Sequence, residues 1–234
     1  MRSEKEIIDL NKRENVQGHH LNTERDLKSM QNQFGLSPES FDGLSVLDIG
    51  SGKSFLAQEL TEKKIETNIV SMDPVRIPEG IKKWGLDSYE KPQRFSPDVT
   101  KKVKEKFVFG MAEGIPFKDN YFDRLIVSYS APYYARTEDQ INEQLREMLR
   151  VVKLGGEIYI APLYVVHPPK SINDADAINE FTDIDSPFRK KKDFELVLEK
   201  LRSEGVSNFS VEYKRIRGHR TIEHYIAKLI KLSQ

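Results

Sequence analysis

The sequence predicts an α/β protein whose sheet is doubly wound, has about seven strands, and is mostly parallel with a C-terminal antiparallel hairpin strand. Two observations predict this fold class. From Ser45 onward, short β-rich runs alternate with helical patterns, as in a parallel sheet that is covered by helices on both faces. After Gly205, two strand-like runs follow each other without a helix between them, which indicates an antiparallel pair.

Five runs have the continuous apolar character of strands that are buried on both faces. We expect these strands at residues 46–50, 68–73, 107–110, 124–128 and 157–161. Further along, Phe209, Val211 and Tyr213 alternate with polar residues, and another run covers residues 225–232 after a polar connection that contains Gly218. These two runs are expected to form the closing hairpin.

Helical patterns fill most of the space between the strands. One covers residues 54–63, and a second covers residues 137–152, beginning with a Thr137/Gln140 capping box and stopping at the Gly155-Gly156 pair. A third helix has an apolar stripe at i, i+3, i+4 and i+7, formed by Phe194, Val197, Leu198 and Leu201. Segments 74–106 and 163–191 receive no assignment and are longer than ordinary connections.

Residues 1–43 are expected to form an N-terminal helical extension that caps the functional site, and residues 44–234 the main domain. The extension carries one helix signal, because Leu27, Met30 and Phe34 fall on one face and Thr23 with Asp26 makes a capping pair before them. That helix is expected to end in the stretch from Gly35 to Pro38.

Composition excludes several classes of protein. The 37 Lys and Arg residues balance 37 Asp and Glu residues, so no overall field attracts nucleic acid or an anionic membrane. The absence of cysteine excludes disulfides, a thiolate nucleophile and Cys-ligated metals. The apolar runs are far shorter than the ~20 residues of a membrane helix, and the start of the chain has no apolar segment. We therefore expect a cytoplasmic protein without a membrane span.

The strongest functional signal is the segment 46–55, VLDIGSGKSF, in which a buried strand enters a glycine-bearing turn and then a helix. Gly50 and Gly52 allow the backbone to bend sharply and to approach a ligand, which favours a nucleotide-like molecule. A phosphate-binding loop is excluded by its spacing, since it would need glycine where Leu47 stands. A pyrophosphate fingerprint is disfavoured because Phe55 occupies the position of its third small residue.

Two further segments follow in order. Asp73 ends the second strand and lies 21 residues after Gly52, close to the ~20 expected of an acid that accepts from both ribose hydroxyls. The segments 110–117, GMAEGIPF, and 120–123, NYFD, run from the third strand toward the fourth. Residues 145–160 then form a helix, a Gly-Gly turn and the fifth strand.

With these motifs in this order, residues 45–232 resemble the class I S-adenosylmethionine-dependent methyltransferase family. The resemblance implies a Rossmann-like fold and S-adenosylmethionine as cofactor. It places Asp48, Gly50, Ser51 and Gly52 at the methionine end of the cofactor, with Asp48 serving the amino group directly or through water. It assigns the ribose to Asp73, and Ser128 is counted with the cofactor-binding residues.

The same resemblance assigns adenine recognition to residues 111–113. Many family members have an acidic residue at the position of Met111, which can pack against a ring but accepts hydrogen bonds only weakly. This departure leaves recognition to the backbone amide of Ala112 and to Glu113. Phe117, Phe122 and Asp123 are assigned to structure rather than to binding, as two core aromatics and a carboxylate at the start of a strand.

The acceptor pocket is expected after the fourth strand, at residues 128–134, because ligands bind beyond the carboxyl ends of the strands in open α/β sheets. Tyr133, Tyr134 and His167 are the candidate catalytic residues. We expect a small-molecule acceptor and no metal, since His19 and His20 have no third ligand of suitable type nearby.

Three alternatives stay open. In the first alternative, the acceptor is RNA or a nucleobase. Basic strings at 189–192 and 214–220 favour this acceptor. Residues 130–133, SAPY, also match in part the nucleobase-binding motif of one branch of the family. The second is an NAD-dependent oxidoreductase, which Asp73 fits equally well. The third is a non-catalytic methyltransferase-fold binding subunit, suggested by Met111.

Overall fold

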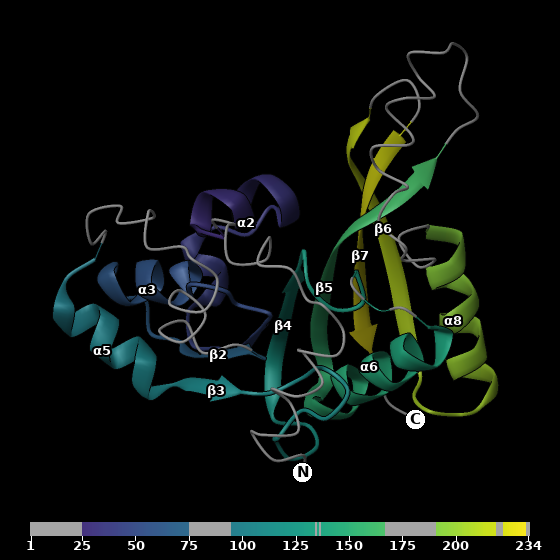
Figure 1. The fold of residues 1–234 in the computed structure, drawn as a ribbon, viewed down its shortest axis with the longest axis horizontal. Helices are drawn as coiled ribbons and strands as arrows, with labels where there is room; N and C mark the ends of the chain where they lie inside the picture. The colour runs from purple at the N-terminus through teal and green to yellow at the C-terminus, as the bar shows by residue number, and fades with distance from the viewer. Residues whose placement is uncertain are drawn as a thin grey trace.

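The computed structural model describes residues 25–74, 95–133, 135, 137–166, 191–218 and 222–232. Within these residues the chain forms one sheet whose strand order is β3-β2-β1-β4-β5-β7-β6 (Figure 1). The strands are β1 (Ser45–Ile49), β2 (Asn68–Asp73), β3 (Phe107–Phe109), β4 (Phe122–Ser128), β5 (Val152–Val166), β6 (Phe209–Gly218) and β7 (Ile222–Lys231).

The first five strands are parallel, and β7 is antiparallel to both β5 and β6. The predicted doubly wound sheet with an antiparallel strand near its C-terminal edge is therefore confirmed. The order reverses between β1 and β4, so the carboxyl ends of these two strands form the switch point where ligands bind in open α/β sheets.

Helices cover both faces of the sheet (Figure 1). They are α2 (Leu27–Phe34), α3 (Phe55–Glu62), α5 (Pro97–Glu105), α6 (Glu138–Val151) and α8 (Lys191–Ser203), with a short 3-10 helix, η2, at Pro38–Phe41. One hydrophobic core contains residues of α2, α3 and α5, and the other contains residues of α6 and α8. We call the two sides of the sheet the α2/α3 face and the α6/α8 face.

The alternation of side chains along each strand decides which residues meet which helices. Val46 of β1 and Ile126 of β4 pack in the core of the α2/α3 face, whereas their neighbours Leu47 and Leu125 pack in the core of the α6/α8 face. By the same alternation, Asp48 of β1 and Ser128 of β4 fall on the α2/α3 face, two residues after Val46 and Ile126. Asp73 of β2 falls on that face too, four residues after Ile69. The sheet thus gathers its polar strand-end residues on one side.

Several predicted boundaries were wrong. Helix α6 ends at Val151, and the Gly155-Gly156 pair lies inside β5 rather than at a helix end. A Cβ on Gly156 would stand 2.9 Å from the backbone oxygen of Asp123, so glycine is needed here for the close approach of β5 to β4. The Thr137 side chain accepts from the Gln140 amide, which confirms the Thr137 half of the predicted capping box.

The two segments without a sequence assignment contain regular structure at their ends. Helix α5 occupies part of the first, capped by Ser96 and with Pro97 in its first turn. Strand β5 continues to Val166 because it pairs with β7 as far as Ile222, so this ribbon extends past the end of β4 (Figure 1). The predicted capping pair lies partly outside the described residues, and Asp26 alone is the N-cap of α2.

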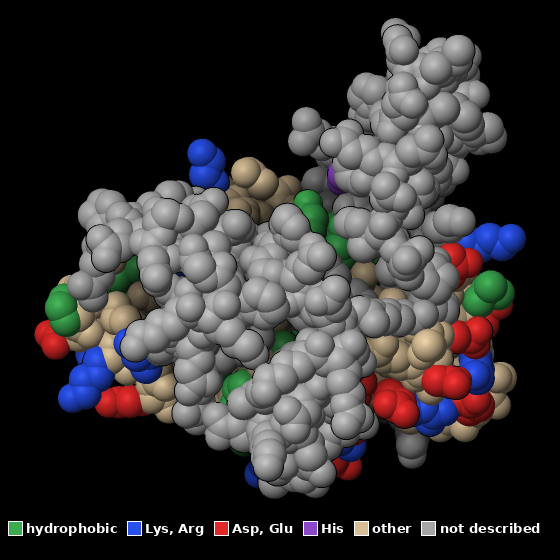
Figure 2. Space-filling view, in the orientation of Figure 1, with side chains coloured by type: hydrophobic (Ala, Val, Ile, Leu, Met, Phe, Trp, Pro, Cys, Tyr) green, Lys and Arg blue, Asp and Glu red, His purple; other side chains and the backbone are tan. Residues whose placement is uncertain are grey.

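None of the described helices combines the length and the apolar character that crossing a membrane requires. On the side shown in Figure 2, acidic and basic side chains are interspersed over α6 and α8. The predicted division into an extension at residues 1–43 and a domain at 44–234 stays a prediction, although α2 and η2 pack directly on the sheet.

Candidate functional site

The turn between β1 and α3 has the conformation that its glycines permit. Gly50 and Gly52 have φ angles of +67° and +54°, and a Cβ on Gly50 would stand 2.4 Å from the Cβ of Ser130. Any side chain at position 50 would therefore collide with the segment that follows β4. The Ser130 hydroxyl donates to the Ile49 carbonyl at 2.7 Å and fixes that segment against the turn.

Strand β2 holds the turn from its other side. The amides of Gly50 and Ser51 donate to the Met72 carbonyl at 2.7 and 3.1 Å. The Gly52 amide donates to Oδ2 of Asp73 at 3.0 Å. The structure therefore brings the predicted loop and the predicted ribose-binding acid together, and Asp73 is 9% exposed.

Asp48 is the most unusual residue of the site. Its side chain is 1% exposed, and neither carboxylate oxygen has a hydrogen-bond partner among the described residues. Burial raises the pKa of Asp48 to about 6, although the nearby charge of Arg25 lowers it and that of Asp73 raises it further. The Ser71 hydroxyl, on the strand position paired with Asp48, is also buried without a partner in this part of the chain.

Two residues of the N-terminal segment contact the end of β4, and sequence analysis did not predict either. Nη1 of Arg25 donates to the Ser128 carbonyl at 2.5 Å, and the Ser128 hydroxyl donates to Oε1 of Gln33 at 2.8 Å. Arg25 is only 5% exposed. An isolated arginine before a helix has no periodic signal, so its burial could not be predicted from the sequence.

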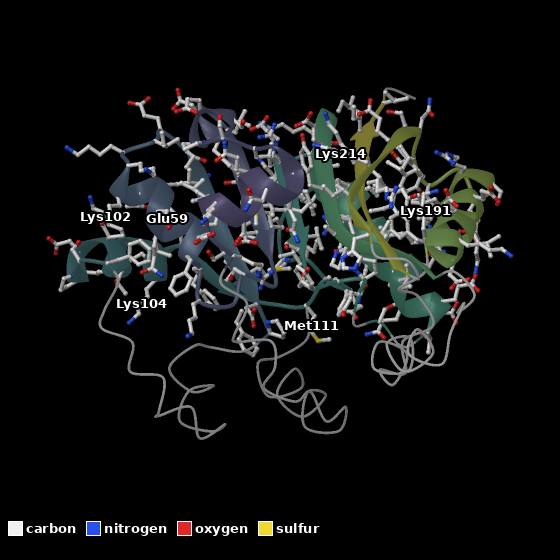
Figure 3. The ribbon with its side chains drawn as sticks, turned by 90° about the horizontal axis from the view of Figure 1, so that it is seen from above. Glu59, Lys102, Lys104, Met111, Lys191 and Lys214 are labelled. Carbon is white, nitrogen blue, oxygen red and sulfur yellow. The ribbon has the colours of Figure 1, made fainter. Side chains whose placement is uncertain are left out.

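The segment after β3 is held by α6. Oε1 of Glu113 accepts from the side-chain amides of Gln140 and Gln144 at 2.6 and 2.9 Å, so Glu113 ties this segment to the helix. Ala112 is buried in the core of the α6/α8 face. Met111 is half-buried, and its side chain points away from the sheet (Figure 3).

Aromatic side chains follow β4, as predicted. The rings of Tyr129 and Tyr133 meet edge to face with their centroids 6.0 Å apart. Tyr129 has a φ of +46°, and its amide donates to the Ala161 carbonyl of β5 at 2.7 Å. The other two candidate catalytic residues, Tyr134 and His167, lie outside the described residues, as do His19 and His20.

The residues of this site fit S-adenosylmethionine. Asp48 offers two buried acceptor oxygens to an ammonium group, which would satisfy a carboxylate that otherwise lacks a partner in the described chain. Gly50 and Gly52 present backbone without side chains in the way. Asp73 ends the adjacent strand, where a ribose would follow.

The strand order, the antiparallel β7 and the site at the carboxyl ends of β1, β2 and β4 define a class I S-adenosylmethionine-dependent methyltransferase. The model of the ubiE/COQ5 methyltransferase family matches residues 19–170, well over half of the chain. The chain therefore belongs to the ubiE/COQ5 methyltransferase family, and S-adenosylmethionine is its methyl-donor cofactor. The family match therefore excludes the alternative of an NAD-dependent oxidoreductase.

Curated relatives match a shorter part of the chain than the family model does. The ubiquinone/menaquinone biosynthesis C-methyltransferase UbiE of Cupriavidus pinatubonensis is 31% identical over 129 residues, which are 54% of this chain and 46% of that protein. The demethylmenaquinone methyltransferase of Renibacterium salmoninarum is 27% identical over 119 residues, 51% of this chain and 41% of that protein. The matched part spans less than half of the length of these relatives.

Solved structures with the same fold cover nearly the whole chain. The PH0226 protein of Pyrococcus horikoshii has a TM-score of 0.54 at 16% identity and covers 94% of this chain and 98% of that one. The N-methyltransferase NodS of Bradyrhizobium japonicum has a TM-score of 0.51 at 13% identity, with coverage of 92% and 98%. At such identities these likenesses show the fold alone.

Proposed function

We propose that this protein transfers a methyl group to a ring carbon of a small aromatic acceptor of the hydroquinone type. One observation carries the proposal: the family match runs from residue 19 to residue 170 and so includes every element that builds the site, from α2 to β5. One matched relative is named a ubiquinone/menaquinone biosynthesis C-methyltransferase. Another is named a demethylmenaquinone methyltransferase.

The chain's own residues orient the reactants and exclude water. When bound, S-adenosylmethionine supplies an electrophilic methyl group, whose bond to sulfur breaks as the bond to the acceptor carbon forms. Asp48 and the Gly50 turn hold the amino-acid end, and Asp73 holds the ribose. Arg25, which precedes α2, and Gln33 of α2 both contact Ser128 and so place this N-terminal segment beside the switch point.

The acceptor region lies beyond β4, where Tyr129 and Tyr133 supply aromatic walls for a flat ring. Methylation at carbon releases a ring proton, so a base assists the reaction. Tyr133 is the candidate for this role within the described residues, beside Tyr134 and His167 from the sequence.

A nucleobase acceptor is less well supported. In the nucleobase branch of the family, the position of Ser130 carries an amide or carboxylate that holds the base. Here the Ser130 hydroxyl donates to the Ile49 carbonyl and is 9% exposed, so it serves the turn after β1.

The test has two stages. Calorimetric titration with S-adenosylmethionine and S-adenosylhomocysteine, with NAD and ATP as controls, is expected to show micromolar binding of the two sulfur nucleotides alone. Asp73→Ala should abolish this binding, whereas Asp98→Asn, an exposed acid in the first turn of α5, should leave it unchanged. NAD binding in place of the sulfur nucleotides would contradict the cofactor-site assignment.

The second stage supplies radiolabelled S-adenosylmethionine with a short-chain demethylmenaquinol, kept reduced, and in parallel with RNA. We expect label in the quinol, and mass spectrometry should place the new methyl group on the ring. Label in RNA would move the assignment to a nucleobase acceptor. Cofactor binding without transfer to either would favour the non-catalytic subunit.

A further inference from the structure

Arg25, far from β4 in the sequence, lies against the carboxyl end of that strand in the folded protein. Its guanidinium donates to the carbonyl of Ser128, the last residue of β4. In the pairing of β1 with β4, Ile49 stands opposite Val127, so Ser128 lies beside Gly50 at the switch point. Arg25 thus brings a positive charge to the end of the glycine turn.

The surroundings of this guanidinium leave it incompletely satisfied. Arg25 is 5% exposed, and its Nε is buried without a hydrogen-bond partner in the described part of the chain. Its charge lowers the pKa of Asp48, yet the two side chains are not hydrogen-bonded to each other. Both carboxylate oxygens of Asp48 lack a hydrogen-bond partner among the described residues. Burying a charge without full pairing is costly, so a structural role alone does not explain this arrangement.

The residues that follow Arg25 fix the backbone next to it. Asp26, the next residue, caps α2 by accepting from the Ser29 amide at 2.9 Å. The Leu27 amide donates to Oε2 of Glu59 on α3 at 2.7 Å. Three apolar residues of α2 then pack in the core of the α2/α3 face: Leu27, Met30 and Phe34. The guanidinium is therefore preorganised rather than carried on a loose arm.

We infer that Arg25 is a cofactor-binding residue, whose guanidinium holds the carboxylate of the cofactor's amino-acid end while Asp48 holds its ammonium group. Among the described residues, Arg25 and Asp48 keep buried polar atoms without hydrogen-bond partners, and their charges match a zwitterion of opposite polarity. A guanidinium is the side chain best suited to a carboxylate. This inference rests on the proposed function, since it uses the same cofactor site, and it makes the N-terminal segment part of that site.

A purely structural role for Arg25 makes a different prediction. If the guanidinium only holds the Ser128 carbonyl, its loss should weaken every ligand of the site by the same factor. If it binds the ligand carboxylate, its loss should weaken only ligands that carry that group. The ratio of two affinities within one variant separates these cases, and it does not depend on the fraction of protein that is folded.

The experiment compares S-adenosylhomocysteine with the same thioether nucleoside lacking only the carboxylate, by calorimetric titration of the full chain. The wild type is expected to prefer S-adenosylhomocysteine by about 10- to 100-fold, the usual range for a charge-assisted hydrogen-bond pair. In Arg25→Gln this preference should fall to about twofold or less, because the decarboxylated nucleoside loses no contact.

Three variants complete the test. Arg25→Lys keeps the charge without the planar fork, so the preference should fall severalfold, and this variant replaces Arg25→Gln if the latter does not fold. Gln33→Ala removes a neutral contact to the same Ser128 and should keep the preference of the wild type. Lys28→Gln changes one exposed charge on α2 and should also keep it.

An unchanged preference in both Arg25 variants would overturn this inference while leaving the proposed function intact. Equal affinity of the wild type for the two nucleosides would do the same. Failure of the wild type to bind either nucleoside would overturn the inference together with the cofactor-site assignment on which it rests.

Discussion

Two carboxylates lie on the α2/α3 face of the same sheet, and their surroundings are opposite. Glu157 of β5 accepts from Nη2 of Arg124 at 2.5 Å and from Nζ of Lys228 at 2.6 Å. Arg124 in turn donates to the Ser40 carbonyl at 2.5 Å. Burial tends to raise the pKa of Glu157, but the hydrogen bonds from Lys228 and Arg124 hold this pKa below its usual value.

Asp48, toward the carboxyl end of β1, has no such partners among the described residues. Burial therefore dominates, and its pKa is raised to about 6. The comparison separates two uses of a charged residue in one sheet. The carboxylate of Glu157 stabilises the fold and is paired within the protein. The carboxylate of Asp48, which we propose binds a charged ligand, has no hydrogen-bond partner among the described residues, at a cost in stability.

The largest effect is expected on cofactor affinity. Asp48→Asn replaces the acceptor of an ammonium group by a neutral amide and should lower the affinity for S-adenosylhomocysteine by about 100-fold or more. Calorimetry measures this loss. Glu157→Gln is the matched control on the same face and should leave the affinity unchanged; equal losses in both variants would remove the distinction between the two carboxylates.

The same Asp48→Asn substitution should stabilise the protein without ligand. The folded state holds the Asp48 proton more tightly than the unfolded chain, where the pKa is about 3.9, so stability falls as the pH rises from about 4 to about 6. Removing the charge should therefore add up to about 3 kcal/mol above pH 7 and little near pH 4. Urea unfolding at both pH values checks this, and destabilisation at pH 7 would show that Asp48 is already paired.

Glu157→Gln should have the opposite effect on stability. It removes the negative charge that Arg124 and Lys228 share, and we expect a loss of about 1 to 3 kcal/mol in the free energy of unfolding. Glu204→Gln, which breaks an exposed pair with Arg146, should cost less than about 1 kcal/mol. If the two losses were equal, burial would not distinguish these ion pairs.

Cofactor affinity should depend on pH through Asp48. Because its ionised form pairs with the ammonium group, affinity should be constant above about pH 7 and fall by up to about tenfold per pH unit below about pH 6. Titrations with S-adenosylhomocysteine from about pH 5 to pH 8 measure this profile. In Asp48→Asn the profile should be flat over that range, and a wild-type profile without this inflection would show that another group binds the amine.

The smallest effect concerns Tyr159, which lies at the edge of the ion-pair cluster formed by Glu157, Arg124 and Lys228. The Tyr159 hydroxyl donates to Oε2 of Glu157 at 3.3 Å, while its ring packs edge to face on Phe34. Tyr159→Phe keeps the ring contact and should cost about 0.5 kcal/mol in urea unfolding. A loss above about 2 kcal/mol would mean that the cluster depends on this hydroxyl rather than on its ion pairs.

The parts of the site that were predictable from sequence are those built by local spacing. The turn at Gly50 and Gly52 follows directly from a buried strand entering a helix, and the distance in sequence to Asp73 is set by one βαβ unit. Strand alternation then fixes the face on which Asp48 and Asp73 lie. The class of ligand was predictable because all these features belong to short segments.

The parts that sequence did not reveal depend on packing between distant segments. Arg25 meets Ser128 across 103 positions of the chain, a contact that exists only because α2 packs on the sheet. Glu113 could not be recognised as a tether, since its partners lie on α6. Helix α5 was missed because only Val103 of its residues is buried, although Ser96 and Pro97 were a start signal.

The most direct test of the account is a crystal structure of the protein with S-adenosylhomocysteine. The account predicts the ligand's ammonium within hydrogen-bond distance of Asp48 and its carboxylate on the guanidinium of Arg25, with the ribose at Asp73. A nucleoside bound at another edge of the sheet, or Asp48 still without a partner in the complex, would contradict it.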